Sequence, residues 1–213
     1  MGPAPGMKVV IISDTHTQHE GLGTLSGDVL IHCGDIGLGT RPAWQEVQRL
    51  DAWFGRQAFK LILCTGGNHD SALEQAAGRG STTFKNATYL QDKEVVLDGV
   101  RFYGAPWVPE LEGWAFYQSG PSLRGRWAMI PENTDVLITH SPPYGILDAN
   151  TAGRRCGCKD LRDRIDGLRL RLHCFGHIHA SAGTMKVGDT MYVNASMVDR
   201  TYKIVRRPVQ VEL

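Results

Sequence analysis

The chain has 213 residues, 42% hydrophobic and 21% charged, which is the composition of an ordinary globular protein. Its 23 basic and 22 acidic residues leave a net charge of +1, so no extended nucleic-acid surface or attraction to an anionic membrane is expected. No apolar run approaches the roughly 18–20 residues that span a bilayer. The N-terminus lacks the features of a signal peptide, and we expect a flexible leader over residues 1–6, a single domain over 7–213 and a cytoplasmic location.

Three apolar runs in the first third of the chain predict central β-strands. Residues 8–12, 28–33 and 61–64 are continuous runs of apolar and mostly branched side chains, typical of strands covered on both faces. Between the second and third runs, a helix is predicted to begin at Pro42 and to end at Gly55. Its expected buried positions are Trp44, Val47, Leu50 and Phe54. This alternation of strand and helix favours a mostly parallel sheet.

The rest of the chain continues with short strands and two further helices. Asp98-Gly99 lies between two apolar segments and predicts a hairpin over 95–103. The other predicted strands cover 135–139, 169–175 and 204–211, with a hairpin over 185–194 that turns at Gly188-Asp189, and helices near 123–130 and 161–168. We therefore predict an α/β fold, a four-layer αββα sandwich of two mixed β-sheets flanked by helices.

The strand at 61–64 leads into the stretch around which the chain is organised, Thr65-Gly66-Gly67-Asn68-His69-Asp70. Its two glycines predict a sharp turn at the end of the strand, where open α/β sheets build their sites. Four other predicted strands also end in polar residues. Together the strand ends supply seven candidate metal ligands: Asp14, His16, Asp35, Asn68, His140, His177 and His179.

Each of these residues has an ordinary interpretation when taken alone, because Asp and Asn are common turn residues. As a set, they could hold two divalent ions if one carboxylate bridges. Imidazole, carboxylate and amide ligands together suit Mn, Fe or Zn rather than Ca or Mg. In Asp14-x-His16 and His177-x-His179, alternate residues would point the same way if the backbone were extended.

The ordered set Asp-x-His, Gly-Asp, Gly-Asn-His-Asp, Thr-His and Gly-His-x-His closely resembles the calcineurin-like metallophosphoesterases. Segments such as Ile-Thr-His-Ser-Pro-Pro and Tyr-Val-Asn-Ala-Ser are similar to the small metallophosphoesterase-domain-containing subgroup. Studied members of that subgroup hydrolyse phosphodiesters, including cyclic nucleotides. The resemblance implies a small phosphodiester or nucleotide as the substrate, with Mn as the favoured metal.

Carried over to this chain, the resemblance assigns one metal to Asp14, His16, Asp35 and His179, and the second to Asp35, Asn68, His140 and His177. It implies direct attack of a metal-bridging hydroxide on phosphorus. His69 would then be the catalytic residue that stabilises the phosphoryl charge or protonates the leaving oxygen.

Two alternatives stay open. A phosphomonoesterase or protein phosphatase is one, but protein phosphatases of this family show an Arg two residues after the Asn-His pair, where this chain has Ser71. The other is a non-catalytic scaffold of the same fold, which predicts lost ligands in the last motif, where this chain keeps His177 and His179. Some members of the subgroup carry Gly at the position of His177.

Weaker signals surround these motifs. Trp107 and Trp114 lie in a loop that could stack on a nucleobase, or could close the end of the core. The basic residues of 154–164 could reach a phosphate, but alternating Asp residues favour a solvated helix face. His19 and His32 lie near the candidate ligands and are expected to support them or to pack, and His173, within a predicted strand, is expected to pack.

Overall fold

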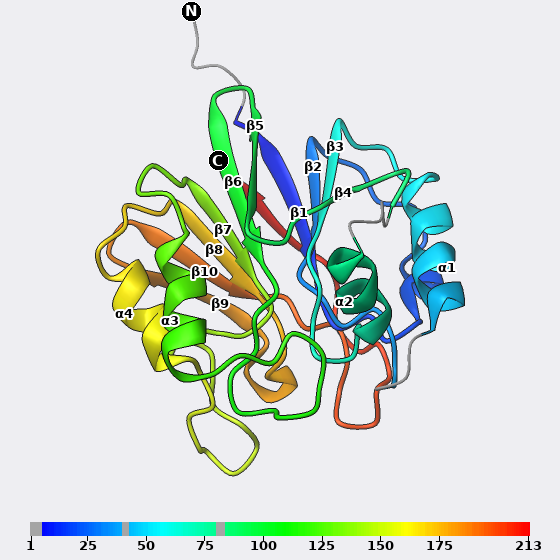
Figure 1. Ribbon diagram of the computed structural model, residues 1–213. Coiled ribbons are helices and arrows are strands. Elements are labelled where there is room, and N and C mark those ends of the chain that lie inside the picture. The colour runs from blue at the N-terminus through cyan, green and yellow to red at the C-terminus, as the bar shows by residue number, and fades with distance from the viewer. Residues whose placement is uncertain (1–5, 40–42, 80–83) are drawn as a thin grey trace, which may run out of the picture.

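The computed structural model describes residues 6–39, 43–79 and 84–213, and in this part of the chain two β-sheets stack face to face with helices on their outer sides (Figure 1). The first sheet has the strand order β11-β1-β2-β3-β4 and the second has β5-β6-β7-β8-β10-β9. The strands of the first sheet are β1 (Lys8–Ile12), β2 (Val29–His32), β3 (Leu61–Cys64), β4 (Thr88–Tyr89) and β11 (Val209–Glu212). Those of the second are β5 (Lys93–Leu97), β6 (Val100–Ala105), β7 (Val136–Thr139), β8 (Leu172–Phe175), β9 (Gly183–Val187) and β10 (Thr190–Asn194).

Both sheets are mixed. β1, β2, β3 and β4 run parallel, whereas β11 pairs antiparallel with β1. In the second sheet β6, β7, β8 and β10 run parallel, and the hairpin partners β5 and β9 are antiparallel. Because parallel strands end at the same edge of a sheet, the loops that follow β1, β2, β3, β7 and β8 gather at one end of the molecule.

The alternation of side chains along each central strand explains why the runs are apolar throughout. In β1, Val9 and Ile11 pack between the two sheets, while Val10 and Ile12 face the helices. All four side chains are buried. A strand with partners on both faces needs apolar residues at every position, which is why these runs show no polar alternation.

Helices α1 (Trp44–Phe54) and α2 (Ser71–Gly78) lie beside the first sheet, and α3 (Gly120–Ala128) and α4 (Lys159–Ile165) lie beside the second (Figure 1). Two short 3-10 helices, η1 (His19–Leu22) and η2 (His179–Ser181), complete the elements. α1 buries Val47, Leu50 and Phe54 as expected, but the structure places Trp53 in the core and leaves Trp44 38% exposed. Trp44 is the first residue of the helix.

The predicted αββα fold and the two hairpins are confirmed, the latter turning at Asp98-Gly99 and Gly188-Asp189. Two details differ. The predicted strand 204–211 is confirmed only over its last residues, because β11 begins at Val209. Ile204 forms only an isolated bridge with Val198, and a turn near the site precedes it at 199–203. Helix α2 was not predicted, although its Ala, Leu, Glu and Gln residues favour a helix.

Pro42, the predicted helix start, and nearly all of the predicted leader lie outside the described residues. None of the helices in the described part of the chain is long and apolar enough to cross a membrane.

Candidate metal centre

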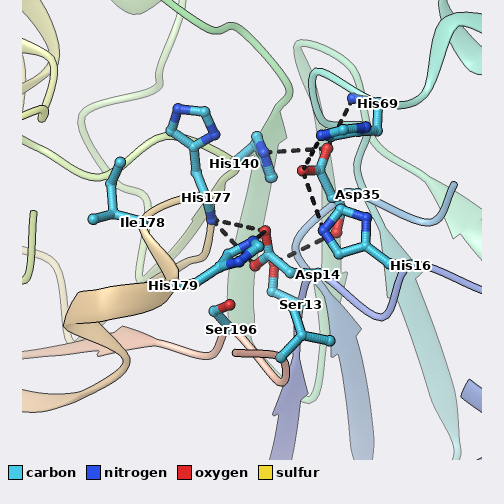
Figure 2. A network of polar contacts seen from close by, with 12 residues as sticks. Ser13, Asp14, His16, Asp35, His69, His140, His177, Ile178, His179 and Ser196 are labelled. Carbon is cyan, nitrogen blue, oxygen red and sulfur yellow. Dashed lines mark hydrogen bonds and ion pairs between the residues drawn. The ribbon is translucent and has the colours of Figure 1, made fainter. Parts of the chain in front are cut away.

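The seven candidate ligands meet at the carboxyl ends of strands from both sheets. Figure 2 shows Asp14 and Asp35 surrounded by histidines, with dashed contacts from Asp35 to His16, His69 and His140. The two carboxylates are buried, with at most 2% of either residue exposed. Buried carboxylates need positively charged or hydrogen-bonding partners, and this cluster supplies them from five strand ends.

The local backbone that aims these side chains is not the extended one that the sequence suggested. Asp14, His16, Asp35 and His177 all have positive φ, between 42° and 68°. This conformation is uncommon for residues other than glycine, and it concentrates at functional sites. The condition under which alternate residues would point the same way, an extended backbone, is therefore not met in either pair. Sharp left-handed turns bring the side chains together instead.

Gly67 shows why a glycine is needed in the organising stretch. A methyl group at this position would overlap the Asp35 carboxylate and the His140 ring. Gly66 and Gly67 are absent from the described residues with positive φ, so their role is close approach rather than the left-handed turn that glycine often supplies.

One group of ligand atoms, called half-site one, consists of Asp14, His16 and His179, whose donor atoms lie within 4.8 Å of one another. His179 Nε2 is 3.3 Å from Asp14 Oδ1. The backbone N–H of His177 donates to both Asp14 oxygens at 3.1 Å, which fixes the orientation of the carboxylate. Half-site one could hold a metal ion.

A second group, called half-site two, consists of Asp35, His140 and His177, again with donor atoms within 4.8 Å. His140 Nε2 lies 3.3 Å from Asp35 Oδ1 and 3.0 Å from Asn68 Oδ1, so the amide oxygen of Asn68 joins this group. The other Asp35 oxygen, Oδ2, lies 3.8 Å from His16 Nε2 of half-site one. Asp35 therefore stands between the two half-sites, as a bridging ligand must.

Two of the imidazoles are held by backbone carbonyls. His16 Nδ1 is 2.7 Å from the Gly37 carbonyl and His140 Nδ1 is 2.9 Å from the Cys33 carbonyl. Since a carbonyl only accepts, each Nδ1 carries a proton, and each Nε2 is the nitrogen left facing the cluster as the potential metal ligand. Buried His16 Nε2 has no hydrogen-bond partner among the described residues. Such orienting bonds are typical of metal-ligating histidines, and the donors present fit divalent cations.

The charges of the cluster also suit a cation. Burial raises the pKa of Asp14, but the hydrogen bond from His179 and the charge of His140 outweigh it and hold the pKa at about 2. The pKa of Asp35 lies well below its usual range, because His140 and His16 outweigh the effect of burial. Burial lowers the pKa of His140, yet Asp35 raises it to about 9. The carboxylates are thus ionised, and a metal would take the place of the proton on His140.

His69 lies at the rim of half-site one. Its backbone N–H donates to Asp35 Oδ1 at 2.9 Å, and its Nε2 is 3.9 Å from Asp35 Oδ2. Its ring meets His16 edge-on at 4.9 Å and the ring of Trp114 at 4.8 Å. His16, Asp35 and His69 form a third group of converging atoms, so this geometry allows His69 a ligand role beside the predicted catalytic one.

The two tryptophans suggested as substrate contacts have different surroundings. Trp107 is only 4% exposed, its Nε1–H donates to Asp92 at 2.7 Å, and the Arg126 guanidinium covers its ring at 4.3 Å. The expectation of a nucleobase on Trp107 is corrected: this ring closes the core, since its faces already have partners. Trp114 alone lies beside the candidate centre.

Asp70 is a positioning residue that the motif contained but the sequence analysis left without a role. Its buried carboxylate accepts the backbone N–H groups of Asp35, Ile36, Gly37 and Gly67 at 2.8–3.1 Å. Burial and the charge of Asp35 raise its pKa to about 7, and the N–H donors oppose this rise. These bonds fix the loop that carries both Asp35 and the Gly37 carbonyl that orients His16.

The basic segment lies around a separate and larger cavity of about 590 Å³, between the aromatic loop and the start of α4. Arg155 is paired with the buried Asp148 at 2.7 Å, Arg154 lies 3.8 Å from Glu110, and Lys159 lies over the Tyr144 ring. The cations in this cavity are therefore largely neutralised or covered. The 300 Å³ pocket over the candidate centre is smaller, but it is lined by the chemistry-bearing residues Asp35, Asn68, His69, His177 and His179.

Comparison with known proteins now identifies the family. The profile of the calcineurin-like phosphoesterases matches residues 7–181. The chain belongs to the calcineurin-like phosphoesterases. Human metallophosphoesterase domain-containing protein 1 is 34% identical over 97% of this chain and 71% of its own length. A UPF0046 protein of Caenorhabditis elegans is 37% identical over 96% of this chain and 74% of its own length.

The resemblance to the metallophosphoesterase-domain-containing subgroup is thereby confirmed. Among solved structures, the phosphopantetheinyl hydrolase of Mycobacterium tuberculosis superposes with a TM-score of 0.62 over 98% of this chain and 97% of its own. At 17% identity this match shows the shared fold alone. Family membership and the clustered donors together indicate a metal-dependent phosphoester hydrolase.

Proposed function

We propose that this calcineurin-like phosphoesterase is a phosphodiesterase that uses two divalent ions, with Mn favoured, to hydrolyse small phosphodiesters such as cyclic nucleotides. The observation that carries the proposal is Asp35, which stands between two groups of ligand atoms on a pair of sheets. Seven donors exceed what one ion needs, and a single buried carboxylate shared by two ions is the arrangement that two-metal hydrolysis requires.

Two bound cations would supply an activated water and neutralise charge on the phosphoryl oxygens. The chain's own residues do the rest. Asp70 and the carbonyls of Cys33 and Gly37 hold the ligand set in register. His69 carries a nitrogen, Nδ1, without a partner among the described residues, and its ring is suited to protonate the leaving oxygen or stabilise the phosphoryl charge.

The diester is favoured over the monoester by the surroundings of His69. Trp114 borders this ring with an edge-on contact and offers an apolar neighbour to the second substituent of a diester. Ser71, where protein phosphatases of the family show Arg, is a buried residue at the start of α2. A short Ser at this position brings no permanent positive charge to bind the additional negative charge of a phosphomonoester.

A scaffold function is a weaker candidate, because this chain keeps the full ligand set, with His177 and His179 beside the carboxylates. We also propose a cytoplasmic location from the cysteines. Their number, five, is odd, and the four buried ones serve as small apolar side chains, which suits a reducing compartment.

The test is a hydrolysis panel with manganese-loaded protein. It compares bis(p-nitrophenyl) phosphate, p-nitrophenyl phosphate, cyclic nucleotides and a dinucleotide. We expect kcat/KM to be highest for diesters. A clear preference for the aryl monoester would replace this proposal with a phosphomonoesterase, and no turnover in protein with two bound manganese ions would favour the scaffold.

A further inference from the structure

A turn that precedes the last strand, β11, forms one wall of the pocket over the candidate centre. The pocket of about 300 Å³ is lined by Arg200 and Tyr202 from this turn, and by Asn150 and Thr151 on a second loop. Neither loop belongs to the sequence motifs of the metal ligands. The chemistry that the turn brings to the pocket is therefore separate from the ligand set.

The turn over residues 199–203 is built by its own hydrogen bonds. Asp199 Oδ1 accepts the N–H groups of Thr201 and Lys203 and the Thr201 hydroxyl, at 2.8–3.1 Å. The backbone closes the turn, because Asp199 N–H donates to the Lys203 carbonyl at 3.0 Å. These bonds within the turn define the positions of Arg200 and Tyr202 on it.

Two further contacts tie the turn to the centre. The Arg206 guanidinium donates to the carbonyl of His179 at 3.0 Å and to that of Val198. On the other side, Gln18 Nε2 donates to the carbonyl of Tyr202. His179 belongs to half-site one, so Arg206 links Val198, the residue just before the turn, to the backbone of a candidate ligand.

Tyr202 covers half-site one with its ring. It meets His16 edge-on at 4.7 Å and His179 at 5.8 Å, and lies 6.2 Å from His69. The backbone of Tyr202 has φ of +59°, a left-handed conformation that turns the chain sharply at this point. A group entering the pocket at half-site one therefore passes Tyr202.

Arg200 supplies the charge. Among the described residues that line this pocket, it carries the one permanent positive charge, and its guanidinium makes no hydrogen bond or ion pair within the described chain. Asn150, Thr151 and Asn68 in the same lining are neutral, and Asp35 is its one carboxylate among the described residues. The contrast is with Arg155 in the larger cavity, which a buried carboxylate already neutralises.

We propose that Arg200, held by the 199–203 turn beside Tyr202, is a substrate-binding residue that contacts a phosphate oxygen in this pocket. Guanidinium groups bind phosphate oxygens with paired N–H donors. The phosphate has two sources, the one that is hydrolysed or a second phosphate on the same substrate. The inference rests on the proposed hydrolase function for its biological meaning, but phosphate binding can be measured without turnover.

The first experiment titrates inorganic phosphate into manganese-loaded protein by calorimetry. Arg200→Ala should weaken binding about tenfold, the lower end expected for one charge-assisted hydrogen bond at an exposed site. Arg200→Lys should recover part of the loss. Lys203→Ala is the matched control, since Lys203 is a cation of the same turn that does not line the pocket. The phosphate affinity of this variant should equal that of the wild type.

The second experiment separates the two phosphate sources. It compares thymidine 5′-(p-nitrophenyl phosphate) with the same ester carrying an added 3′-phosphate. If Arg200 binds the hydrolysed phosphate, Arg200→Ala lowers kcat/KM equally for both. If it binds the second phosphate, the loss is confined to the 3′-phosphorylated ester and appears in KM.

Unchanged phosphate affinity and unchanged kinetics in Arg200→Ala would overturn the inference while leaving the hydrolase proposal intact. Conversely, phosphate binding that depends on Arg200 in a protein that hydrolyses no ester would support the inference and reject the proposed function. Equal losses in Arg200→Ala and Lys203→Ala would reduce the effect to general charge and also overturn it.

Discussion

The two half-sites share Asp35 but differ in charge. Half-site one adds a second carboxylate, Asp14, to its histidines, whereas half-site two adds only the neutral amide of Asn68. Cation affinity rises with the number of charged ligands in a site. An ion bound in half-site two would therefore depend more heavily on each of its imidazoles, and it should leave first when metal is scarce.

Behind each half-site lies a buried histidine bonded to a threonine next to a ligand. His32 Nε2 is 2.9 Å from Thr15 Oγ1, and His173 Nε2 is 2.9 Å from Thr139 Oγ1. The pairs are not equivalent, because His32 Nδ1 also accepts the N–H of Gly34. His173 Nδ1 has no partner in the described structure. The support behind half-site one is therefore the more completely bonded.

The largest effect is expected where the two half-sites meet. Asp35→Asn removes the one charge that both ions would share, so manganese binding should fall from near two equivalents to one or none. Activity should drop further than for any other single ligand. Elemental analysis of the reconstituted wild type and variant measures the stoichiometry. A wild-type protein that saturates at one equivalent of manganese would show that the two half-sites do not each hold an ion.

His69→Ala tests the group that lies outside both half-sites. If its role is catalytic, metal content stays near two equivalents while activity falls roughly 10²–10⁴-fold, as for a positioned acid or oxyanion donor. The loss should be smaller for nitrophenolate, which leaves without a proton. Loss of a metal equivalent in this variant would instead make His69 the ligand that its 3.9 Å approach to Asp35 permits.

His177→Gly should act on half-site two alone. An ion in half-site two would keep only Asp35, Asn68 and His140 as ligands. The manganese affinity of half-site two should therefore fall by more than the 10–100-fold typical of losing an outer-shell partner. Activity should collapse at trace manganese and recover in part as manganese is raised. Asp14→Asn is the matched change in half-site one, and its manganese titration should show the other ion weakened. Identical titrations for His177→Gly and wild type would remove His177 from the ligand set.

The smallest effect concerns acid stability and the two supporting histidines. Burial lowers the pKa of both His32 and His173 to about 3, below the 6.5 of an exposed histidine. Between pH 6.5 and pH 3 these histidines are protonated in the unfolded state but neutral in the folded state. Their contribution to the free energy of unfolding is therefore fully present above pH 6.5 and is lost as the pH falls toward 3. Each group contributes a slope of up to about 1.4 kcal/mol per pH unit.

His173→Gln should flatten this slope, measured as the difference from wild type in urea unfolding between pH 8 and pH 5, and should cost little at pH 8. His32→Gln should flatten the slope too, but also cost about 1–3 kcal/mol at pH 8 because the Gly34 N–H loses its acceptor. Equal costs at pH 8 would contradict the asymmetry between the two supports.

Several elements of the fold could be predicted because local pattern and tertiary environment agree. The run at 8–12 is apolar at every position since both faces of β1 are covered, and Asp98-Gly99 turns a hairpin wherever it stands between strands. The last predicted strand starts too early, at 204 rather than at Val209, for the opposite reason. Alternating apolar residues there satisfy a strand pattern, but Ile204 forms only an isolated bridge with Val198 beside the 199–203 turn.

The sequence by itself determined the seven candidate ligands and their order along the chain, because metal chemistry restricts the residue types and parallel strands bring their carboxyl ends together. Tertiary structure alone decided how those residues converge. The positive φ angles of Asp14, Asp35 and His177 are imposed by bonds to distant groups, such as the Asp70 carboxylate on the Asp35 loop. Tertiary structure also places Arg200 and Tyr202 beside the pocket and buries Trp107 in the core. These positions depend on partners far along the chain, and no local pattern encodes a partner at such a distance.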